Sequence, residues 1–267
     1  MSDAMFAFLV TLVAGLFTGI GGLIALFAKK DNTNFLAICL SFSAGVMIYI
    51  SFVEIFDKAR ESLVYVHGDE KGIFITSLAF FGGIAIIAVI DRLIPHEDET
   101  LQSLTPKSDI SSLTIKDTTA LRRMGLMSAL AIAIHNFPEG LVTFVATMED
   151  PSLGIAIAFA IAIHNIPEGI AMAVPIYYAT GSRKKALLIS VLSGLTEPLG
   201  GLFAYFFLLN FFSDNMFGII FAAVGGIMVY ISFNQLLPTA QKYGNHRTVM
   251  KGLFAGMLVM AVSLIFI

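Results

Sequence analysis

Long apolar stretches limit what this chain can fold into more than any other feature of its sequence. A helix needs about 20 apolar residues to cross the roughly 30 Å hydrocarbon core of a bilayer. Eight such stretches follow one another in the 267 residues, covering about 5–28, 34–57, 72–94, 120–147, 151–178, 184–209, 215–240 and 248–267. Charged residues make up only 13% of the chain, against roughly 25% in soluble domains. The sequence therefore predicts an all-α polytopic membrane protein that forms a single domain, 1–267, in the lipid bilayer.

The distribution of Lys and Arg predicts how the spans are oriented. Thirteen of the 16 basic residues lie in or beside the first, third, fifth and seventh loops, and the other three flank the second loop. Because basic residues concentrate on the cytoplasmic side of membrane proteins, both termini are expected on the outer side. The third loop, about 95–119, is predicted to be a flexible cytoplasmic linker, with weak metal binding at its His96 as the alternative. The net charge of −3 argues against a nucleic-acid partner.

Two internal repeats indicate how the spans are related. The segment Ala131–Gly140 recurs as Ala160–Gly169 in the next span with a single substitution. The segment Gly45–Phe52 in the second span resembles Gly226–Phe233 in the seventh, which crosses the membrane in the opposite direction. The pattern predicts a 3+2+3 arrangement, in which spans 1–3 and 6–8 form inverted repeats around a central pair, spans 4 and 5. Inverted repeats with a site near the membrane midplane are typical of transporters that work by alternating access.

The central pair and the sixth span carry polar side chains at membrane depth. Seven of them are candidate metal ligands: His135, Asn136, Glu139, His164, Asn165, Glu168 and Glu197. No Lys or Arg lies at this depth, so the three carboxylates require either protonation or a bound cation. Imidazole and carboxylate ligands without Cys favour Zn²⁺, Fe²⁺, Mn²⁺ or Co²⁺ over Ca²⁺ and Mg²⁺. Hydrogen bonding between helices is the structural alternative, which the duplication of the motif disfavours.

Each copy of the repeated motif also contains a proline and a glycine. Pro138 and Pro167 have no N–H to donate to the carbonyl four residues earlier, so both helices are expected to break at membrane depth around a polar cavity. Gly140 and Gly169 are expected to allow a neighbouring backbone to approach closely.

The paired His-Asn-x-Pro-Glu-Gly motifs, the eight spans and the outward termini resemble the ZIP (Zrt/Irt-like) family of metal transporters, in particular its bacterial ZupT-type branch. The resemblance covers nearly the whole chain, including the stretch Ser193–Glu197. It implies import of zinc, and also of iron, manganese, cobalt or cadmium, across a bacterial inner membrane. It implies no prosthetic group, and it implies homodimers among the members.

The resemblance also implies two adjoining metal sites. One, which prefers Zn²⁺, would be formed by His135, Glu139, His164 and Glu168. The second, associated with Fe²⁺, would be formed by Asn136, Glu139, Asn165, Glu168 and Glu197. Spans 1, 4, 5 and 6 would move against spans 2, 3, 7 and 8, and the glycine-rich face of span 1 would suit a sliding contact.

Three positions outside these motifs need separate interpretation. Asn234 and Gln235 stand where ZupT-type sequences usually carry an acidic pair, so weaker attraction of cations is expected there. Glu54 is either a residue of the cation pathway or a solvated residue near the outer interface. Asp91 and Arg92 are interpreted as the cytoplasmic end of span 3.

Two other classes of function share part of this pattern. An intramembrane metalloenzyme would use similar ligands but normally carries His-Glu-x-x-His, which this chain lacks. A gated channel for divalent cations would share broken helices but does not need tight imidazole ligation. The repeats and the resemblance favour a secondary transporter that is not an enzyme.

Overall fold

The structure is a computed structural model that describes residues 2–26, 33–93, 136–208 and 213–265. Every regular element within these ranges is helical. Seven of the described helical segments are long and apolar enough to cross a membrane, and they begin at Asp3, Asn34, Asp69, Pro151, Arg183, Asp214 and His246. Of the predicted fourth span, only the helical segment 136–149 is described. The predicted all-α membrane class is confirmed for these ranges.

The helices follow the predicted spans, and several spans consist of more than one element. The α-helices are α1 (Asp3–Ala25), α2 (Thr33–Ile50), α3 (Phe56–His67), α4 (Asp69–Leu93), the segment 136–149, α7 (Pro151–Thr180), α8 (Arg183–Gly194), α9 (Thr196–Phe203), α10 (Asp214–Ile231), α11 (Leu237–Tyr243) and α12 (His246–Ile265). Two π-helical turns join consecutive helices, Ser51–Ile55 between α2 and α3 and Ser232–Leu236 between α10 and α11. A third, Ala204–Leu208, follows α9.

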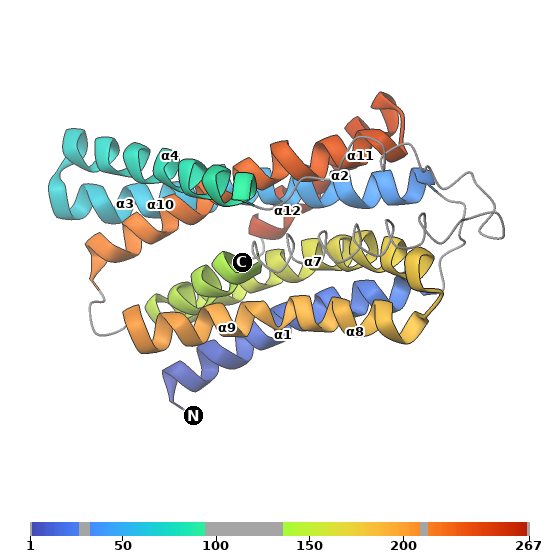
Figure 1. Ribbon diagram of the computed structural model, residues 1–267. Helices are drawn as coiled ribbons and strands as arrows, with labels where there is room; N and C mark the ends of the chain where they lie inside the picture. The colour runs from blue at the N-terminus through green and yellow to red at the C-terminus, as the bar shows by residue number, and fades with distance from the viewer. Residues whose placement is uncertain (1, 27–32, 94–135, 209–212, 266–267) are drawn as a thin grey trace.

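The helices are arranged in two layers (Figure 1). One layer contains α2, α3, α4, α10, α11 and α12, and the other contains α1, the segment 136–149, α7, α8 and α9. Spans 1, 4, 5 and 6 therefore share one layer, and spans 2, 3, 7 and 8 share the other. Where the two layers meet, α2 packs against α7.

The second span is longer than the sequence predicted. The predicted end was near residue 57, but the helix continues through α3 to His67. Two features explain this: Ala59 and Leu63 are buried, and the exposed charges pair along the helix, as Arg60 does with Asp57 at 2.6 Å. Gly68, with a positive φ of 79°, then allows the sharp turn into α4.

The predicted helix break at Pro167 is wrong. The helix α7 runs from Pro151 to Thr180 without interruption, capped by the Asp150 carboxylate at its start. A proline removes only one backbone hydrogen bond, and close packing of α1 on α7 holds the helix on both sides. The break lies instead in span 6, where α8 ends at Gly194 and α9 begins at Thr196. The sequence before Asn136 lies outside the described residues, so the break predicted at Pro138 is untested.

The repeat shared by spans 2 and 7 has the same local structure in both copies. Its two serines, Ser51 and Ser232, each begin a π-helical turn. Each serine hydroxyl also donates to the carbonyl four residues earlier, that of Met47 at 2.6 Å and that of Met228 at 2.8 Å. The turns give both spans a local change of helical register at matching positions.

The glycine-rich face of α1 packs inside its own layer. A Cβ on Gly15 would overlap the carbonyl oxygen of Gly194 in α8, and a Cβ on Gly21 would overlap that of Ile166 in α7. The two backbones therefore touch at each crossing. The close contact expected of this face is present, with partners in the same layer. The sliding of this face stays a prediction.

Candidate metal centre

Six of the seven predicted ligands lie in the described residues, and all six side chains are fully buried. Asn136 and Glu139 come from the segment 136–149, His164, Asn165 and Glu168 from the middle of α7, and Glu197 from the first turn of α9. His135 lies outside the described residues.

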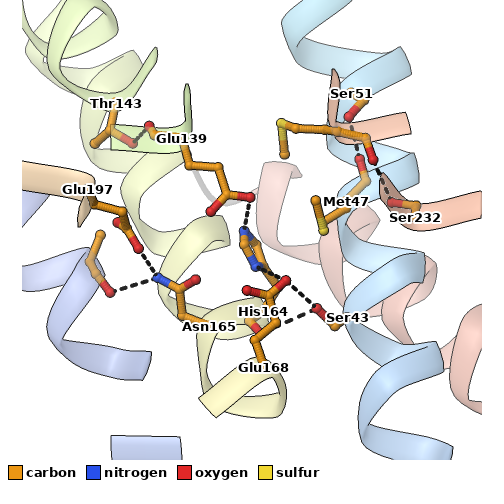
Figure 2. A network of polar contacts seen from close by, with 12 residues as sticks. Ser43, Met47, Ser51, Glu139, Thr143, His164, Asn165, Glu168, Glu197 and Ser232 are labelled. Atoms are coloured by element: carbon orange, nitrogen blue, oxygen red, sulfur yellow. Dashed lines mark hydrogen bonds and ion pairs between the residues drawn. The ribbon is translucent and has the colours of Figure 1, made fainter. Parts of the chain in front are cut away.

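The imidazole of His164 lies between two carboxylates (Figure 2). Its Nε2 is 3.6 Å from Oε1 of Glu139, and its Nδ1 is 3.5 Å from Oε1 of Glu168. One ligand atom from each of the three residues lies within 4.8 Å of the other two. Ligand atoms bound to one tetrahedral Zn²⁺ are roughly 3.5 Å apart, since each bond is about 2.0–2.2 Å long. Small side-chain movements would therefore bring the three groups around a single ion.

The other amide and carboxylate form a second group beside the first. Asn165 donates through Nδ2 to Oε1 of Glu197 at 2.6 Å and to the backbone carbonyl of Ala14 at 3.0 Å. Figure 2 shows Asn165 between Glu197 and the side chains of His164 and Glu168. The predicted ligands are thus divided into a His–Glu–Glu group and an Asn–Glu pair that adjoins it.

Many polar atoms of both groups are buried without a hydrogen-bond partner among the residues that the structure describes. They are both carboxylate oxygens of Glu139, both ring nitrogens of His164, both amide atoms of Asn136, Oδ1 of Asn165 and Oε2 of Glu197. An unsatisfied buried polar group costs about 1–3 kcal/mol, and a charged one more. So many at one place indicate a binding site whose ligand supplies the missing interactions.

A glycine sets how closely the fourth span approaches the sixth. A Cβ on Gly140 would overlap the backbone carbonyl of Glu197, so the two backbones touch beside the predicted ligands. The predicted role of Gly140 as a close-packing residue is confirmed.

One residue at the centre was missed by sequence reasoning. The hydroxyl of Ser43, on α2, lies 3.4 Å from Oε1 of Glu168 and 3.3 Å from the backbone carbonyl of His164. Span 2 contains other buried serines, Ser41 and Ser51, and nothing in the sequence separates Ser43 from them. Only the packing of α2 on α7 identifies it.

Glu54 and His96, the two remaining candidates for cation contact, have different outcomes. Glu54 falls in the π-helical turn after α2, is partly exposed, and is not in the Glu139–His164–Glu168 group. His96 and the rest of the predicted third loop lie outside the described residues.

Comparison with known proteins gives the family. The sequence profile described as ZIP Zinc transporter matches residues 94–264, well over half of the chain. The chain is also 53% identical over 277 residues to the "Zinc transporter ZupT" of Clostridium perfringens, with 99% of this chain and 97% of that protein covered. Proteins of the same name from Oceanobacillus iheyensis and Chlorobium chlorochromatii are 55% and 54% identical, with at least 98% of each chain covered.

The chain belongs to the ZIP family. Within that family it is of the ZupT type, as the resemblance predicted. ZIP proteins are transporters, so the expectation that the chain is not an enzyme is confirmed.

In the layer that contains α2, the amide pair Asn234 and Gln235 contacts the C-terminal part of α4. Asn234 donates to Oδ2 of Asp91 at 2.9 Å and Gln235 donates to Oδ1 at 3.0 Å. Tyr230 also donates to Oδ2, at 3.1 Å. Asp91 does lie near the end of α4, as predicted, but it is 9% exposed and is an acceptor for span 7. Both amide groups therefore donate to the Asp91 carboxylate on α4. Two acidic residues at these positions would repel that carboxylate.

Proposed function

We propose that this ZIP protein imports divalent transition-metal cations, with Zn²⁺ as the main substrate, into the cytoplasm by alternating access. The observation that carries the proposal is the buried group Glu139, His164 and Glu168 beside the contact between the two layers. One imidazole and two carboxylates are suitable ligands for Zn²⁺. The names of the similar proteins, all zinc transporters, give independent support.

The steps follow from the position of these ligands. A hydrated cation entering from outside would exchange water for the oxygen and nitrogen atoms of Glu139 and His164, which lack other partners among the described residues. Movement of the layer that carries the ligands against the layer that contains α2 would then open the centre toward the cytoplasm. The cation is released when its ligands exchange back to water.

We propose that the centre holds two cations. The Zn²⁺-preferring site consists of His135, Glu139, His164 and Glu168, and the second site, which takes Fe²⁺, consists of Asn136, Glu139, Asn165, Glu168 and Glu197. Glu139 and Glu168 would bridge the two ions. The division of the ligands into a histidine group and an asparagine group supports this assignment. Mn²⁺, Co²⁺ and Cd²⁺ are proposed as further substrates.

We also propose that the chain is one domain of eight spans in a 3+2+3 arrangement, in a bacterial inner membrane, with both termini outside and a homodimeric assembly. The matching π-helical turns of spans 2 and 7 support the inverted repeat.

Labelling of cysteines introduced at two exposed positions tests the orientation. A membrane-impermeant reagent should label Glu70→Cys, but not Lys184→Cys, in intact cells. The reverse pattern would invert the topology.

The transport proposal is tested by Zn²⁺ flux into proteoliposomes that contain the purified protein. Wild-type protein should accumulate Zn²⁺ at carrier rates, and Glu139→Gln and His164→Ala should abolish accumulation because each removes a ligand. Glu149→Gln, which changes an exposed carboxylate on the same helical segment as Glu139, is the matched control and should transport normally. Absence of flux in the wild type would reject transport, and flux at channel rates would favour the gated channel. Competition by Fe²⁺, Mn²⁺, Co²⁺ and Cd²⁺ in the same assay gives the substrate range.

A further inference from the structure

Ser43 contacts the candidate metal-ligand group from the opposite layer. Its hydroxyl lies 3.4 Å from Oε1 of Glu168 and 3.3 Å from the carbonyl of His164. Ser43 belongs to α2, whereas both of its partners belong to α7. Figure 2 shows Ser43 reaching from the helix of one layer to the ligands of the other.

This hydrogen bonding differs from that of the other buried serines on the same span. Ser41 donates to the carbonyl of Ala37 in its own helix at 2.7 Å, and Ser51 donates to that of Met47 at 2.6 Å. Such bonds to the carbonyl four residues earlier are the usual arrangement for serine inside a helix. The single hydroxyl proton of Ser43 instead has both of its acceptors, the Glu168 carboxylate and the His164 carbonyl, on α7, so its hydrogen bonding depends on how the two layers are placed.

The oxygen that Ser43 contacts also faces the imidazole. Oε1 of Glu168 lies 3.5 Å from Nδ1 of His164, so one carboxylate oxygen faces both the hydroxyl and the ring. A hydroxyl that donates to a carboxylate fixes its rotamer and stabilises its charge. Residues that hydrogen-bond to metal ligands in this way typically change metal affinity or activity by about 10–100-fold when they are removed.

We propose that Ser43 is a positioning residue that holds Glu168 for metal binding only while α2 and α7 keep the register of this structure. The inference rests on the proposed function, because Glu168 must be a ligand of the transported cation. A separation of 3.4 Å is already long for a hydrogen bond between oxygens, so a slide of α2 by one or two ångströms breaks it. Relative movement of the layers therefore removes a support of the ligand and favours release of the cation.

Three variants of span 2 separate this role from a packing role. Ser43→Ala removes the hydroxyl, and Ser43→Thr keeps it. Ser41→Ala is the matched control, because Ser41 is equally buried in α2 but both acceptors of its hydroxyl proton are carbonyls of its own helix. For each protein, the Kd for Zn²⁺ is measured by calorimetry in detergent, and KM and kcat are measured by flux in proteoliposomes.

We expect Ser43→Ala to raise the Kd and KM for Zn²⁺ about 10-fold, the lower end of the range for such residues, with a smaller change in kcat. Ser43→Thr should restore values near those of the wild type, and Ser41→Ala should leave them unchanged. In a Glu168→Ala background, Ser43→Ala should cause no further loss of affinity, because its acceptor is already absent.

Other results would overturn the role of Ser43. They are an unchanged Kd in Ser43→Ala, an equal effect of Ser41→Ala, or the full effect of Ser43→Ala in the Glu168→Ala background. Failure of the wild type to transport Zn²⁺ would instead reject the proposed function, and the Kd values would still decide whether Ser43 supports a metal-binding site.

Discussion

Asn165 of α7 donates a 2.6 Å hydrogen bond to the carboxylate of Glu197, the second residue of α9. The same amide nitrogen donates to the carbonyl of Ala14, so α1, α7 and α9 meet at one side chain. Oδ1 of Asn165 and Oε2 of Glu197 have no hydrogen-bond partner among the described residues. The bond thus holds two oxygen atoms that can bind a cation beside the histidine-containing group. The proposed second cation would lie there.

Replacement of Asn165 by Ala should reduce Fe²⁺ uptake more than Zn²⁺ uptake. The substitution removes a proposed ligand of the second site and releases Glu197, so we expect about a 10-fold loss for Fe²⁺. Parallel flux of the two metals in the same vesicles measures the ratio. Ser190→Ala on α8, which removes a hydrogen bond inside one helix, is the control and should leave the ratio unchanged. Equal losses for both metals would contradict the division into two sites.

Replacement of Gly140 by Ala should destabilise the protein and impair transport. The added Cβ overlaps the backbone carbonyl of Glu197, which cannot move without displacing α9. Overpacking of this kind typically costs about 1–3 kcal/mol.

The matched substitution is Gly82→Ala in α4, where a Cβ meets nothing within 4 Å. That variant should be as stable as the wild type or slightly more so, since Ala favours helix more than Gly. Thermal unfolding in detergent compares them, and equal melting temperatures would refute the prediction.

Replacement of Asn234 by Asp should weaken the contact between α4 and span 7. The new carboxylate cannot donate to Asp91 and faces its negative charge, so we expect a loss of about 1–3 kcal/mol in stability. Adding Asp91→Asn should recover most of this loss, because the asparagine can then donate to the new carboxylate. Unfolding of the two single variants and the double variant measures the coupling, and simple additivity would show that the pair does not interact.

Glu149 should make stability depend on pH. The Glu149 side chain is exposed, but the protein still shields its carboxyl group partly from water, and this partial burial raises its pKa above the ordinary value. The negative charges of Asp214 and Asp150 raise it further. A carboxyl whose pKa is higher in the folded state destabilises that state when ionised. Glu149→Gln should therefore unfold at a higher temperature than the wild type near neutral pH. The difference should disappear in acid as pH falls through the raised pKa, and a difference that persists there would contradict the prediction.

The sequence determined the class of the protein and most of its candidate ligands. Apolar length predicts membrane spans because a bilayer imposes one thickness on every helix that crosses it, and seven described helices meet that criterion. The duplicated motif identified five candidate ligands, Asn136, Glu139, His164, Asn165 and Glu168. Polar side chains inside a membrane are energetically unfavourable, so a repeated set of them indicates a function. All five are fully buried.

The tertiary structure decided what local patterns do not encode. Pro167 was expected to break α7, but packing against α1 keeps that helix continuous, and the break is at Leu195 in span 6. The weaker cation attraction expected at Asn234 stays a prediction, but the structure adds that Asn234 donates to Asp91, 143 residues earlier in the chain.

Ser43 has the same residue type and burial as Ser41, yet only Ser43 reaches Glu168. Hydrophobicity and spacing depend on neighbours along one helix, and they predict which residues enter the membrane. Which of those residues meet across two layers depends on the relative placement of α2 and α7, which arises only when the whole chain packs.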